Sequence, residues 1–451
     1  MALSGIEIYK LLPGGLKPPH PKANCKECGF PTCLAFAMKL AAKQAELASC
    51  QYVSEEAQEK LAAAAAPPIR LIKVSSNGHE VAAGNETVMY RHEKTFFHPA
   101  GVFVRINDSD GLDAIRELVS TADEYKVNYV GMDLAVDGFA IKSTGDAATF
   151  SAGVEAVRGA TKRPLILISA DAAVMEAGLK AAGDSKSLIC GASPENWEAM
   201  AALAKSHKAP LTVGGSTLDE MAELTDKIKA AGVEDMVLNP VVTTLPEALG
   251  VWTQLRRLAL RKTFRPLGYP IIAFPSQFSA DSQIAAVQAI AKYAGFIVLD
   301  RFNPADLYPL LVFRQNIYTD PQKPIQVSPG LYEINNPGPD SPVMVTTNFS
   351  ITYFSVSNEV EGSGRKGWLL VADAEGMSVL TAWAAGKFDA ERIAKTVKST
   401  GIESKVNHRR LTIPGHVAVL SGELEDELPG WEIKVGPREA VNLPQYLKLM
   451  E

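Results

Sequence analysis

Short apolar runs rich in β-branched residues alternate with amphipathic stretches along residues 95–312. Each run has the length of a buried strand, and each stretch carries apolar residues at helical spacing, which predicts alternating strands and helices. Two predicted helices begin beside the capping residues Ser193 and Thr217. The eight predicted strands are GVFVRI (101–106), NYVGMDLA (128–135), PLILISA (164–170), SLICGA (187–192), PLTVGG (210–215), DMVLNPV (235–241), PIIAFPS (270–276) and FIVLDRF (296–302). Their number and even spacing favour a central (β/α)8 TIM barrel, and a doubly wound sheet is the competing architecture.

Residues 325–451 repeat the alternation with fewer strands. Four apolar runs each lead through a short turn into a helical pattern. These runs are VMVTTN (343–348), WLLVADAEG (368–376), HRRLTIPG (408–415) and WEIKVGP (431–437). So few strands with intervening helices predict a small open α/β sheet of the Rossmann-like kind.

The first sixty residues are separated from the barrel by LAAAAAPP (61–68). Its alanines carry little packing information, and its two prolines end any helix at Ala66. The segment is either a frayed helix end or a tether on which the first region swings. The predicted organisation is an α/β multidomain chain with a module at 1–60, a linker at 61–94, the barrel at 95–320 and the open sheet at 325–451.

The composition is that of an ordinary globular protein, with 47% hydrophobic and 21% charged residues. A net charge of −6 without a basic stripe argues against nucleic acid or an anionic membrane as a partner. The sequence contains no signal peptide and no apolar run near the ~20 residues of a membrane helix, so a cytoplasmic protein is expected. The five cysteines are too sparse for a secreted disulfide scaffold.

Four of the five cysteines share the spacing Cys25-x2-Cys28-x4-Cys33-x16-Cys50. Four thiolates can hold zinc or a cubane iron–sulfur cluster. Zinc sites usually combine two close cysteine pairs, whereas three ligands in one loop and a fourth farther along suit a [4Fe–4S] cluster. Such a cluster would transfer electrons or would only staple a small module.

The residues that follow the cysteine loop, CLAFAMKLAAKQAELA (33–48), are predicted to form a helix after Thr32. Its amino terminus would face the cluster and favour the cluster's negative charge. One face of this helix would hold Leu34, Met38, Ala41 and Ala45.

The barrel carries no catalytic motif. Polar residues predicted at the carboxyl ends of its strands, where barrel active sites lie, are Asp133, Asp137, Asn239 and Asp300. A scaffold or partner-binding barrel is favoured, and a pterin site that uses Asp133 and Asn239 is the alternative. Cys190 in SLICGA is interpreted as a buried, small apolar residue.

The last domain offers a ligand site at its strand–helix turns, TTNFS (346–350), DAEGMS (373–378), PGH (414–416) and GPRE (436–439). Three of them contain glycine, which lets a backbone approach a large ligand, and each opens a helix with free N–H groups. In open α/β sheets ligands lie at such turns. Glycine and serine are also common there for backbone reasons alone, so the sequence leaves both interpretations open.

The segment CKECGFPTCLAFAMKLAAKQAELASC (25–50) closely resembles the N-terminal module of corrinoid iron–sulfur protein large subunits. That family includes the gamma subunit of the acetyl-CoA decarbonylase/synthase complex. The likeness extends over essentially the whole chain, and VADAEGMSVLTAW (371–383) supports it in the last domain. The segment GGLKPPHP (14–21) departs from the family pattern as a short insertion.

The resemblance implies a corrinoid methyl carrier of the reductive acetyl-CoA (Wood–Ljungdahl) pathway, a subunit of a methyltransferase system rather than a stand-alone catalyst. A cobamide would accept a methyl group from methyltetrahydrofolate on Co(I), through a separate methyltransferase, and deliver it to acetyl-CoA synthase. The [4Fe–4S] cluster would return oxidised Co(II) to Co(I). The implied partners are the small subunit of a heterodimer, the methyltransferase, acetyl-CoA synthase/CO dehydrogenase, and a ferredoxin-type electron donor or reductive activator.

The D-x-H-x-x-G motif, which supplies a cobalt-binding histidine in many cobalamin domains, is absent from the chain. His408 and His416 lack its flanking residues and are expected to be structural. We therefore expect a base-off cobamide without a protein His ligand and no catalytic residue from the protein. The predicted corrin contacts are Thr346, Thr347, Asn348, Thr352, Ala374, Gly376, Met377, Ser378, Val379, Thr381, Gly415, Gly436, Pro437, Glu439 and Ala440. The alternative functions are an iron–sulfur electron-transfer protein fused to a barrel without corrinoid, and a pterin-dependent methyltransferase.

Overall fold

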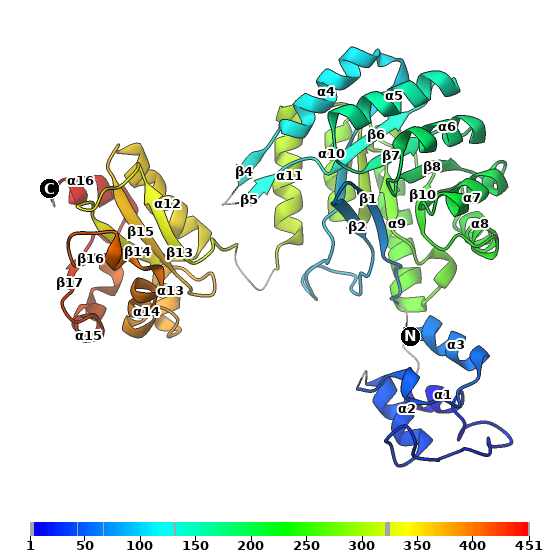
Figure 1. The fold of residues 1–451 in the computed structure, drawn as a ribbon, viewed down its shortest axis with the longest axis horizontal. Coiled ribbons are helices and arrows are strands. Elements are labelled where there is room, and N and C mark those ends of the chain that lie inside the picture. The colour runs from blue at the N-terminus through cyan, green and yellow to red at the C-terminus, as the bar shows by residue number, and fades with distance from the viewer. Residues whose placement is uncertain (1–3, 43, 66, 130–131, 321–324, 450–451) are drawn as a thin grey trace. The chain divides into compact units, whose positions relative to one another are not determined.

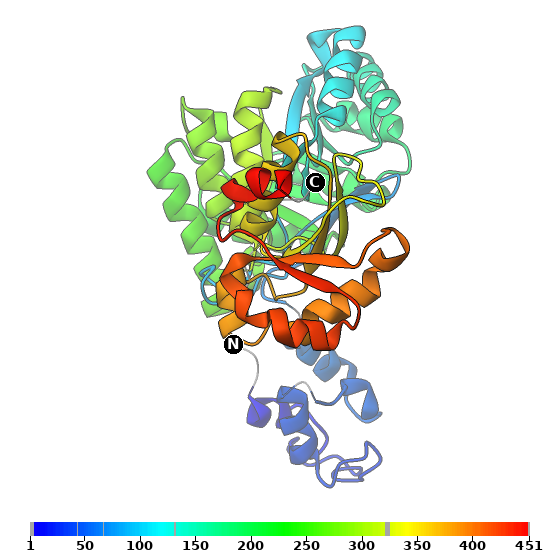
Figure 2. The same ribbon diagram turned by 90° about the vertical axis from the view of Figure 1, so that its left-hand side faces the viewer.

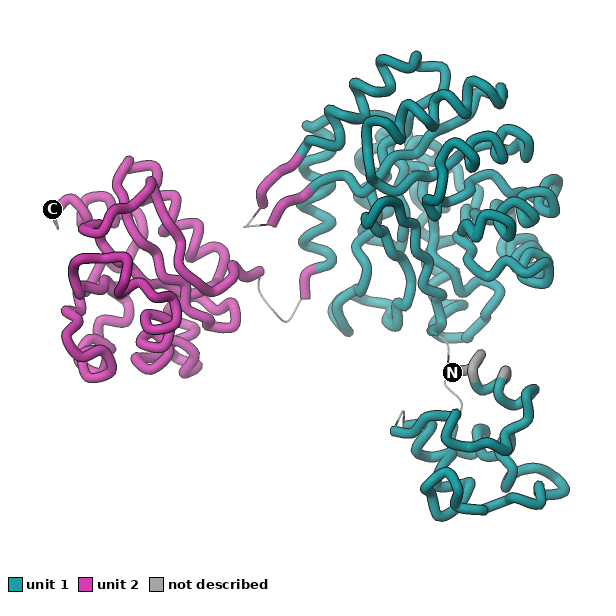
Figure 3. The backbone as a smooth tube through the Cα atoms, viewed as in Figure 1, with its two compact units in different colours: residues 1–125, 135–318 teal, residues 126–134, 319–451 magenta. Residues whose placement is uncertain are grey.

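The computed structural model of the protein describes residues 4–42, 44–65, 67–129, 132–320 and 325–449. The chain divides into two compact units, residues 1–125 with 135–318 and residues 126–134 with 319–451 (Figure 3). The first unit contains a module of short helices and a closed barrel, and the second contains an open sheet (Figure 1). None of the described helices is long and apolar enough to span a membrane.

Eight parallel strands close into a barrel, which confirms the predicted (β/α)8 architecture (Figure 1). In order around the barrel the strands are β3 (Gly101–Asn107), β6 (Gly138–Lys142), β7 (Leu165–Ile168), β8 (Leu188–Ala192), β9 (Leu211–Gly215), β10 (Met236–Pro240), β11 (Ile271–Ala273) and β12 (Ala294–Leu299). Strand β12 pairs with β3 and closes the ring. The intervening helices are α4 (Leu112–Glu124), α5 (Ala147–Ala160), α6 (Ala172–Ala182), α7 (Trp197–Ser206), α8 (Leu218–Ala230), α9 (Leu245–Lys262), α10 (Ser282–Ala291) and α11 (Pro304–Tyr318).

The predicted strand over 128–135 is wrong. Residues Val127–Tyr129 (β4) and Met132–Leu134 (β5) pair with each other as an antiparallel hairpin, and the second barrel strand is β6. Strand β6 begins at Gly138, where a Cβ atom would lie 2.4 Å from both Phe103 Cε1 and Pro164 O. The barrel therefore needs glycine at a strand position, which weakens the apolar signal of GFAIK relative to its neighbour NYVGMDLA.

One of the two predicted helix caps is confirmed. Thr217 caps α8, because its hydroxyl accepts the Glu220 N–H at 3.2 Å. The cap expected at Ser193 is wrong, because α7 begins later and Asn196 occupies its N-cap position. The Asn196 side chain is used in the preceding loop instead, where its Oδ1 accepts the Ser193 N–H and its Nδ2 donates to Gly191 O.

A β-hairpin lies inside the segment predicted as a linker, residues 61–94. Its strands are β1 (Ile72–Ser76) and β2 (His79–Ala83). Their apolar side chains, Ile72 and Val81 among them, pack in one cluster with the barrel's Phe103 and Phe296. Since Val81 Cγ1 lies where a Cβ of Gly101 would come, the hairpin covers the amino-terminal end of the barrel.

The second unit is built on a five-stranded sheet with the order β13-β15-β14-β16-β17. Its strands are β13 (Gly330–Ile334), β14 (Val343–Thr347), β15 (Gly367–Ala372), β16 (Arg410–Ile413) and β17 (Glu432–Val435). The four predicted strands are present and parallel, and β13 adds an antiparallel edge. From β14 the chain first builds to one side with β15 and then to the other with β16, so the strand order reverses at β14.

Helices cover both faces of this sheet (Figures 1 and 2). One apolar cluster joins the sheet to α12 (Ser350–Gly362) and α16 (Leu443–Lys448). A second cluster joins the opposite face to α13 (Val379–Ala384), α14 (Ala390–Thr400) and α15 (Ser421–Glu427). Short 3-10 turns complete the unit at Gly415–Leu420 (η6) and Ala440–Asn442 (η7). The predicted open α/β architecture is therefore present, with β13 and α14 added to it.

The N-terminal module contains α1 (Gly5–Tyr9), α2 (Cys33–Ala41), η1 (Leu47–Ser49) and α3 (Glu55–Ala65) around a small apolar core. The helix predicted over 33–48 is too long, since α2 ends at Ala41. Its buried face carries Phe36 and Ala37, whereas Leu34 and Met38 are 41% and 48% exposed. The predicted helix end at Ala66 lies outside the described residues.

Candidate functional site

Cysteine thiols gather at one side of the N-terminal module. Cys33 is the first residue of α2, and Cys50 follows η1 directly; both are buried, whereas Cys25 and Cys28 are half-buried. The Cys33 N–H donates to Asn24 Oδ1 at 2.8 Å, and the Asn24 N–H points back to Cys33 Sγ at 3.3 Å. Left-handed backbone at Asn24, Lys26 and Gly29 turns the loop sharply around Cys25 and Cys28.

The four thiols lie within electrostatic reach of one another. Burial raises the pKa of the Cys50 thiol, and the thiols of Cys28, Cys33 and Cys25 raise it further. Within the described ranges, no three Cys, His, Asp or Glu side chains come close enough to hold one metal ion. Four cysteine thiols are the donor set that protein iron–sulfur clusters use.

A hydrogen-bonded network ties the cysteine loop to the fourth cysteine. Glu27 lies between Cys25 and Cys28, and the Tyr52 hydroxyl, two residues after Cys50, donates to its Oε2 at 2.6 Å. Lys22 Nζ lies 3.3 Å from the other carboxylate oxygen of Glu27. The cysteine spacing gives no signal for these contacts, because they bridge segments that are separated in sequence.

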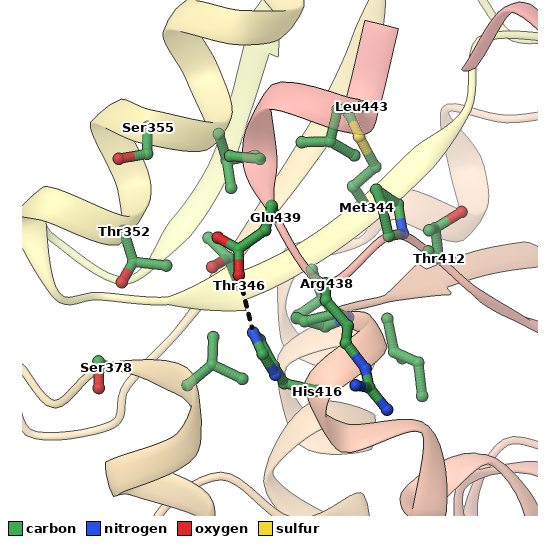
Figure 4. A pocket seen from close by; sticks show the side chains of 18 of the residues that line it. Met344, Thr346, Thr352, Ser355, Ser378, Thr412, His416, Arg438, Glu439 and Leu443 are labelled. Atoms are coloured by element: carbon green, nitrogen blue, oxygen red, sulfur yellow. Dashed lines mark ion pairs between the residues drawn. The ribbon is translucent and has the colours of Figure 1, made fainter. Parts of the chain in front are cut away.

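A pocket of about 310 Å³ opens in the second unit at the carboxyl ends of β14 and β16 (Figure 4). These are the strands between which the sheet order reverses, and ligands of open α/β sheets bind at this position. Its lining residues are Met344, Val345, Thr346, Ile351, Thr352, Ser355, Val356, Ser378, Val379, Leu380, Thr412, Ile413, Pro414, His416, Gly436, Pro437, Arg438, Glu439, Ala440 and Leu443.

Buried hydroxyl groups mark the floor of this pocket. Thr346 is 1% exposed, and its Oγ1 has no hydrogen-bond partner within the part of the chain that the structure describes. Thr352, Ser355 and Ser378 add hydroxyl groups to the lining (Figure 4); the Ser355 hydroxyl donates to Ile351 O at 2.8 Å, and the Ser378 hydroxyl lies 3.0 Å from that of Thr381. A buried hydroxyl without a partner costs about 1–3 kcal/mol, which a ligand with amide or phosphate oxygens would recover. The residues present therefore fit a polar-rimmed ligand such as a corrin.

Eight of the fifteen predicted corrin contacts line the pocket: Thr346, Thr352, Ser378, Val379, Gly436, Pro437, Glu439 and Ala440. The other seven lie outside its lining: Thr347, Asn348, Ala374, Gly376, Met377, Thr381 and Gly415. Two of these seven shape the turns instead. Asn348 Oδ1 accepts the N–H groups of Ala374 and Gly376, both at 2.9 Å. Gly415 allows a backbone crossing, because its Cβ would lie 2.5 Å from Gly436 O.

His408 is structural, as expected. Its Nδ1 accepts the Arg410 N–H at 3.2 Å, so its Nε2 carries the proton and donates to Ser341 O at 3.0 Å. His416, in contrast, lines the pocket, with Nε2 3.7 Å from Glu439 Oε1 (Figure 4). The sequence analysis placed His416 and Arg438 in candidate ligand turns but named neither as a ligand contact, because their place in the pocket depends on the pairing of β16 with β17.

Three of the four polar residues proposed for the barrel mouth, Asp133, Asp137 and Asp300, have separate partners in the structure. Asp133 belongs to the β4–β5 hairpin, where it accepts a hydrogen bond from Asn128 Nδ2 at 3.1 Å. Asp137 precedes β6 and is held by Arg314 and the Val102 N–H, so it lies at the amino-terminal end, contrary to expectation. Asp300 pairs with Arg105 at 2.7 Å beyond β12.

Cys190 sits in β8 as a buried apolar residue. Burial raises the pKa of its thiol to about 11, so it stays protonated and unreactive.

Comparison with known proteins identifies the family of the chain. The family model for the CO dehydrogenase/acetyl-CoA synthase delta subunit matches residues 72–447. The corrinoid/iron–sulfur protein large subunit of Moorella thermoacetica is 44% identical over 450 residues, covering 99% of each chain. The chain belongs to the corrinoid/iron–sulfur protein large-subunit family.

Other members of the corrinoid/iron–sulfur protein family agree with this assignment. The acetyl-CoA decarbonylase/synthase complex subunit gamma of Archaeoglobus fulgidus is 36% identical, over 99% of this chain and 98% of its own. The "Putative Fe-S cluster" model matches residues 21–52, which hold the four clustered cysteines. A dihydropteroate synthase structure from Xanthomonas albilineans covers 55% of the chain at 15% identity and a TM-score of 0.36, a likeness too remote to bear on ligands.

Proposed function

We propose that this chain is a corrinoid methyl carrier that binds a cobamide in its second unit and a [4Fe–4S] cluster in its N-terminal module. When bound, the cobamide supplies a cobalt that accepts and releases a methyl group, and the cluster supplies the electron that restores oxidised cobalt. The methyl donor would be methyltetrahydrofolate, acting through a separate methyltransferase, and the acceptor would be acetyl-CoA synthase. The chain's own residues bind, orient and shield these groups.

The pocket at the β14–β16 reversal carries this proposal. Its floor offers the unpartnered Thr346 hydroxyl, and its walls add Thr352, Ser355 and Ser378 as small hydrogen-bonding groups. Gly436 brings its backbone to the rim, since its Cβ would lie 2.9 Å from Thr412 Cγ2. A pocket of about 310 Å³ is too small to enclose a corrin, so the ring would rest on the rim and only part of the ligand would enter.

No residue of the pocket replaces the missing cobalt-binding motif. His416 is the only histidine in the lining, and its Nε2 faces Glu439 at 3.7 Å. An imidazole at the pocket wall can form hydrogen bonds with the ligand's rim. This supports the proposal that the cobamide is bound base-off without a protein His ligand.

The four cysteine ligands would be Cys25, Cys28, Cys33 and Cys50. Cys33 and Cys50 lie in the apolar core of the module, which limits water around a cluster and favours a low potential. The N–H of Asn24 donates to Cys33 Sγ and would stabilise the thiolate there.

An exposed apolar rim around the pocket supports a covering partner. Ile351 and Leu380 line the opening and are 67% and 46% exposed. Such side chains at the edge of a ligand site are typical of a protein interface. In this proposal the rim contacts the small subunit of a heterodimer. During turnover it contacts the methyltransferase or acetyl-CoA synthase. A ferredoxin-type donor or activator would supply electrons.

A pocket-filling substitution tests the assignment. Ser355 is exposed on α12, so Ser355→Trp would place an indole over the pocket without disturbing the core. Asn358→Trp on the same helix, outside the pocket lining, is the matched control. We expect the control, prepared anaerobically with its small subunit, to show corrin absorption bands and Ser355→Trp to lack them, while both keep the iron–sulfur absorbance. Equal cobamide binding by both variants would place the corrinoid elsewhere.

A further inference from the structure

A second pocket of the C-terminal unit, of about 320 Å³, lies at the opposite end of the sheet from the candidate corrinoid pocket. Val343 and Arg410, its strand residues, are the first residues of β14 and β16, whose other ends line the first pocket. The lining consists of Asp340, Pro342, Val343, Arg365, Lys366, His408, Arg410 and Leu447. The two pockets share no lining residue, although Met344 of the first pocket directly follows Val343 of the second.

Positive charge predominates in this amino-end pocket. The side chains of Lys366 and Arg410 make no ion pair or hydrogen bond with any residue that the structure describes. Arg410 lies opposite Glu432 in the β16–β17 pair, yet that carboxylate pairs with Lys434 at 2.5 Å. The lining carboxylate, Asp340, accepts a hydrogen bond from Asn407 Nδ2 at 3.2 Å. Two cations thus face a concave surface with their charges uncompensated.

The rest of the pocket is rigid and partly apolar. Both ring nitrogens of His408 are engaged with the backbone, at Ser341 and Arg410, so the position of the imidazole in the pocket wall is fixed. Val343 and Leu447 are 1% and 2% exposed. The site therefore combines fixed apolar surfaces with two unpaired cations in a volume suited to a small molecule.

We propose that this pocket binds a phosphoryl group carried by a small organic molecule. A phosphate monoester carries about −1.5 to −2 charges at pH 7, which matches two unpaired cations, whereas a monocarboxylate would leave one uncompensated. The Arg410 guanidinium can bind two phosphoryl oxygens at once, and the Lys366 ammonium adds a point charge. The organic part would rest on Pro342, Val343 and Leu447.

Calorimetric titration of the full chain with phenyl phosphate, at constant ionic strength, tests the site. We expect saturable binding that weakens at least about tenfold in Arg410→Ala and in Lys366→Ala. Lys395→Ala removes an exposed lysine of α14 and should leave the affinity unchanged. The exposed position of Lys366 makes its variant a safe second test if Arg410→Ala unfolds.

Three outcomes would overturn the proposal: no binding of phenyl phosphate at millimolar concentration, unchanged binding in both pocket variants, or equal loss in Lys395→Ala. Titration with benzoate separates phosphoryl recognition from general attraction of anions. Benzoate that binds as tightly as phenyl phosphate would contradict a site selected for phosphoryl groups.

Discussion

Asn348 offers a sharp test of how the second unit positions its pocket. The side chain is 1% exposed, and all four of its hydrogen-bonding capacities are used. Its Oδ1 accepts the N–H groups of Ala374 and Gly376, and its Nδ2 donates to Gln326 Oε1 and Asp373 Oδ1. The amide therefore fixes the turn that carries Ser378 and Val379 into the pocket wall.

The magnitude of Asn348→Ala follows from the two N–H groups that it leaves buried. Each unsatisfied group costs about 1–3 kcal/mol, so we expect a loss of about 3 kcal/mol or more in the local stability of the turn. That corresponds to roughly a hundredfold faster amide exchange, at about 1.4 kcal/mol for each factor of ten. The amide exchange rate of Asn348→Asp should lie between those of the unsubstituted protein and Asn348→Ala. The aspartate keeps an oxygen that accepts both N–H groups, but it puts a second carboxylate beside Asp373.

Hydrogen exchange read by mass spectrometry on peptides that cover 370–380 measures this effect in the intact chain. Asn358→Ala, an exposed asparagine of α12, is the matched control and should leave exchange unchanged. We also expect weaker cobamide retention in Asn348→Ala, because the pocket wall loosens. Unchanged protection of the turn in Asn348→Ala would refute the role assigned to this side chain.

Three further predictions concern the module and the barrel. Tyr52→Phe removes the hydrogen bond to Glu27 and should speed iron release to a chelator several-fold. Tyr308→Phe, at an exposed position of barrel helix α11, is the control and should not change the release rate. Equal release rates in the two variants would contradict a stabilising role for the Tyr52–Glu27 hydrogen bond. Cys28→Ala should lose the cluster yet keep methyl transfer from pre-reduced cobalt. Loss of transfer under those conditions would contradict the proposal that the cluster only reduces cobalt and takes no part in methyl transfer. Burial lowers the pKa of His98, whose Nε2 lacks a partner within the described residues. As the pH falls through about 6.5, the unfolded state therefore binds a proton before the folded state does. The free energy of unfolding should then decrease more in the unsubstituted protein than in His98→Gln. Equal pH dependence of the free energy of unfolding in the two proteins would contradict this role of His98.

The repeating pattern of the chain predicted most of the fold because buried strands and amphipathic helices have distinct periods. The pattern failed at 128–135, where an alternating hairpin resembled a barrel strand and the true strand began with a glycine required by Phe103. It also failed to end α2 at Ala41, because helix-forming residues continue past the point where the chain turns back toward Cys50.

Candidate site residues could be named from the sequence where the chemistry follows from residue spacing, and they were missed where it follows from strand order. The four cysteines proposed as ligands lie in one short segment, so their spacing alone made them candidates. Met344 and Thr412 line the pocket only because β14 and β16 are neighbours, and His416 and Arg438 only because β16 pairs with β17. Thr347, by contrast, follows Thr346 directly yet lies outside the lining, and its neighbours in the sequence do not reveal this difference.

Transfer of a labelled methyl group tests the central claim most directly. The chain, loaded anaerobically with cluster and cobamide and joined to its small subunit, would be mixed with labelled methyltetrahydrofolate and the separate methyltransferase. A methyl carrier should take up about one labelled methyl group for each cobamide bound and release it to acetyl-CoA synthase. A fully loaded, reduced chain that acquires no label would contradict the account.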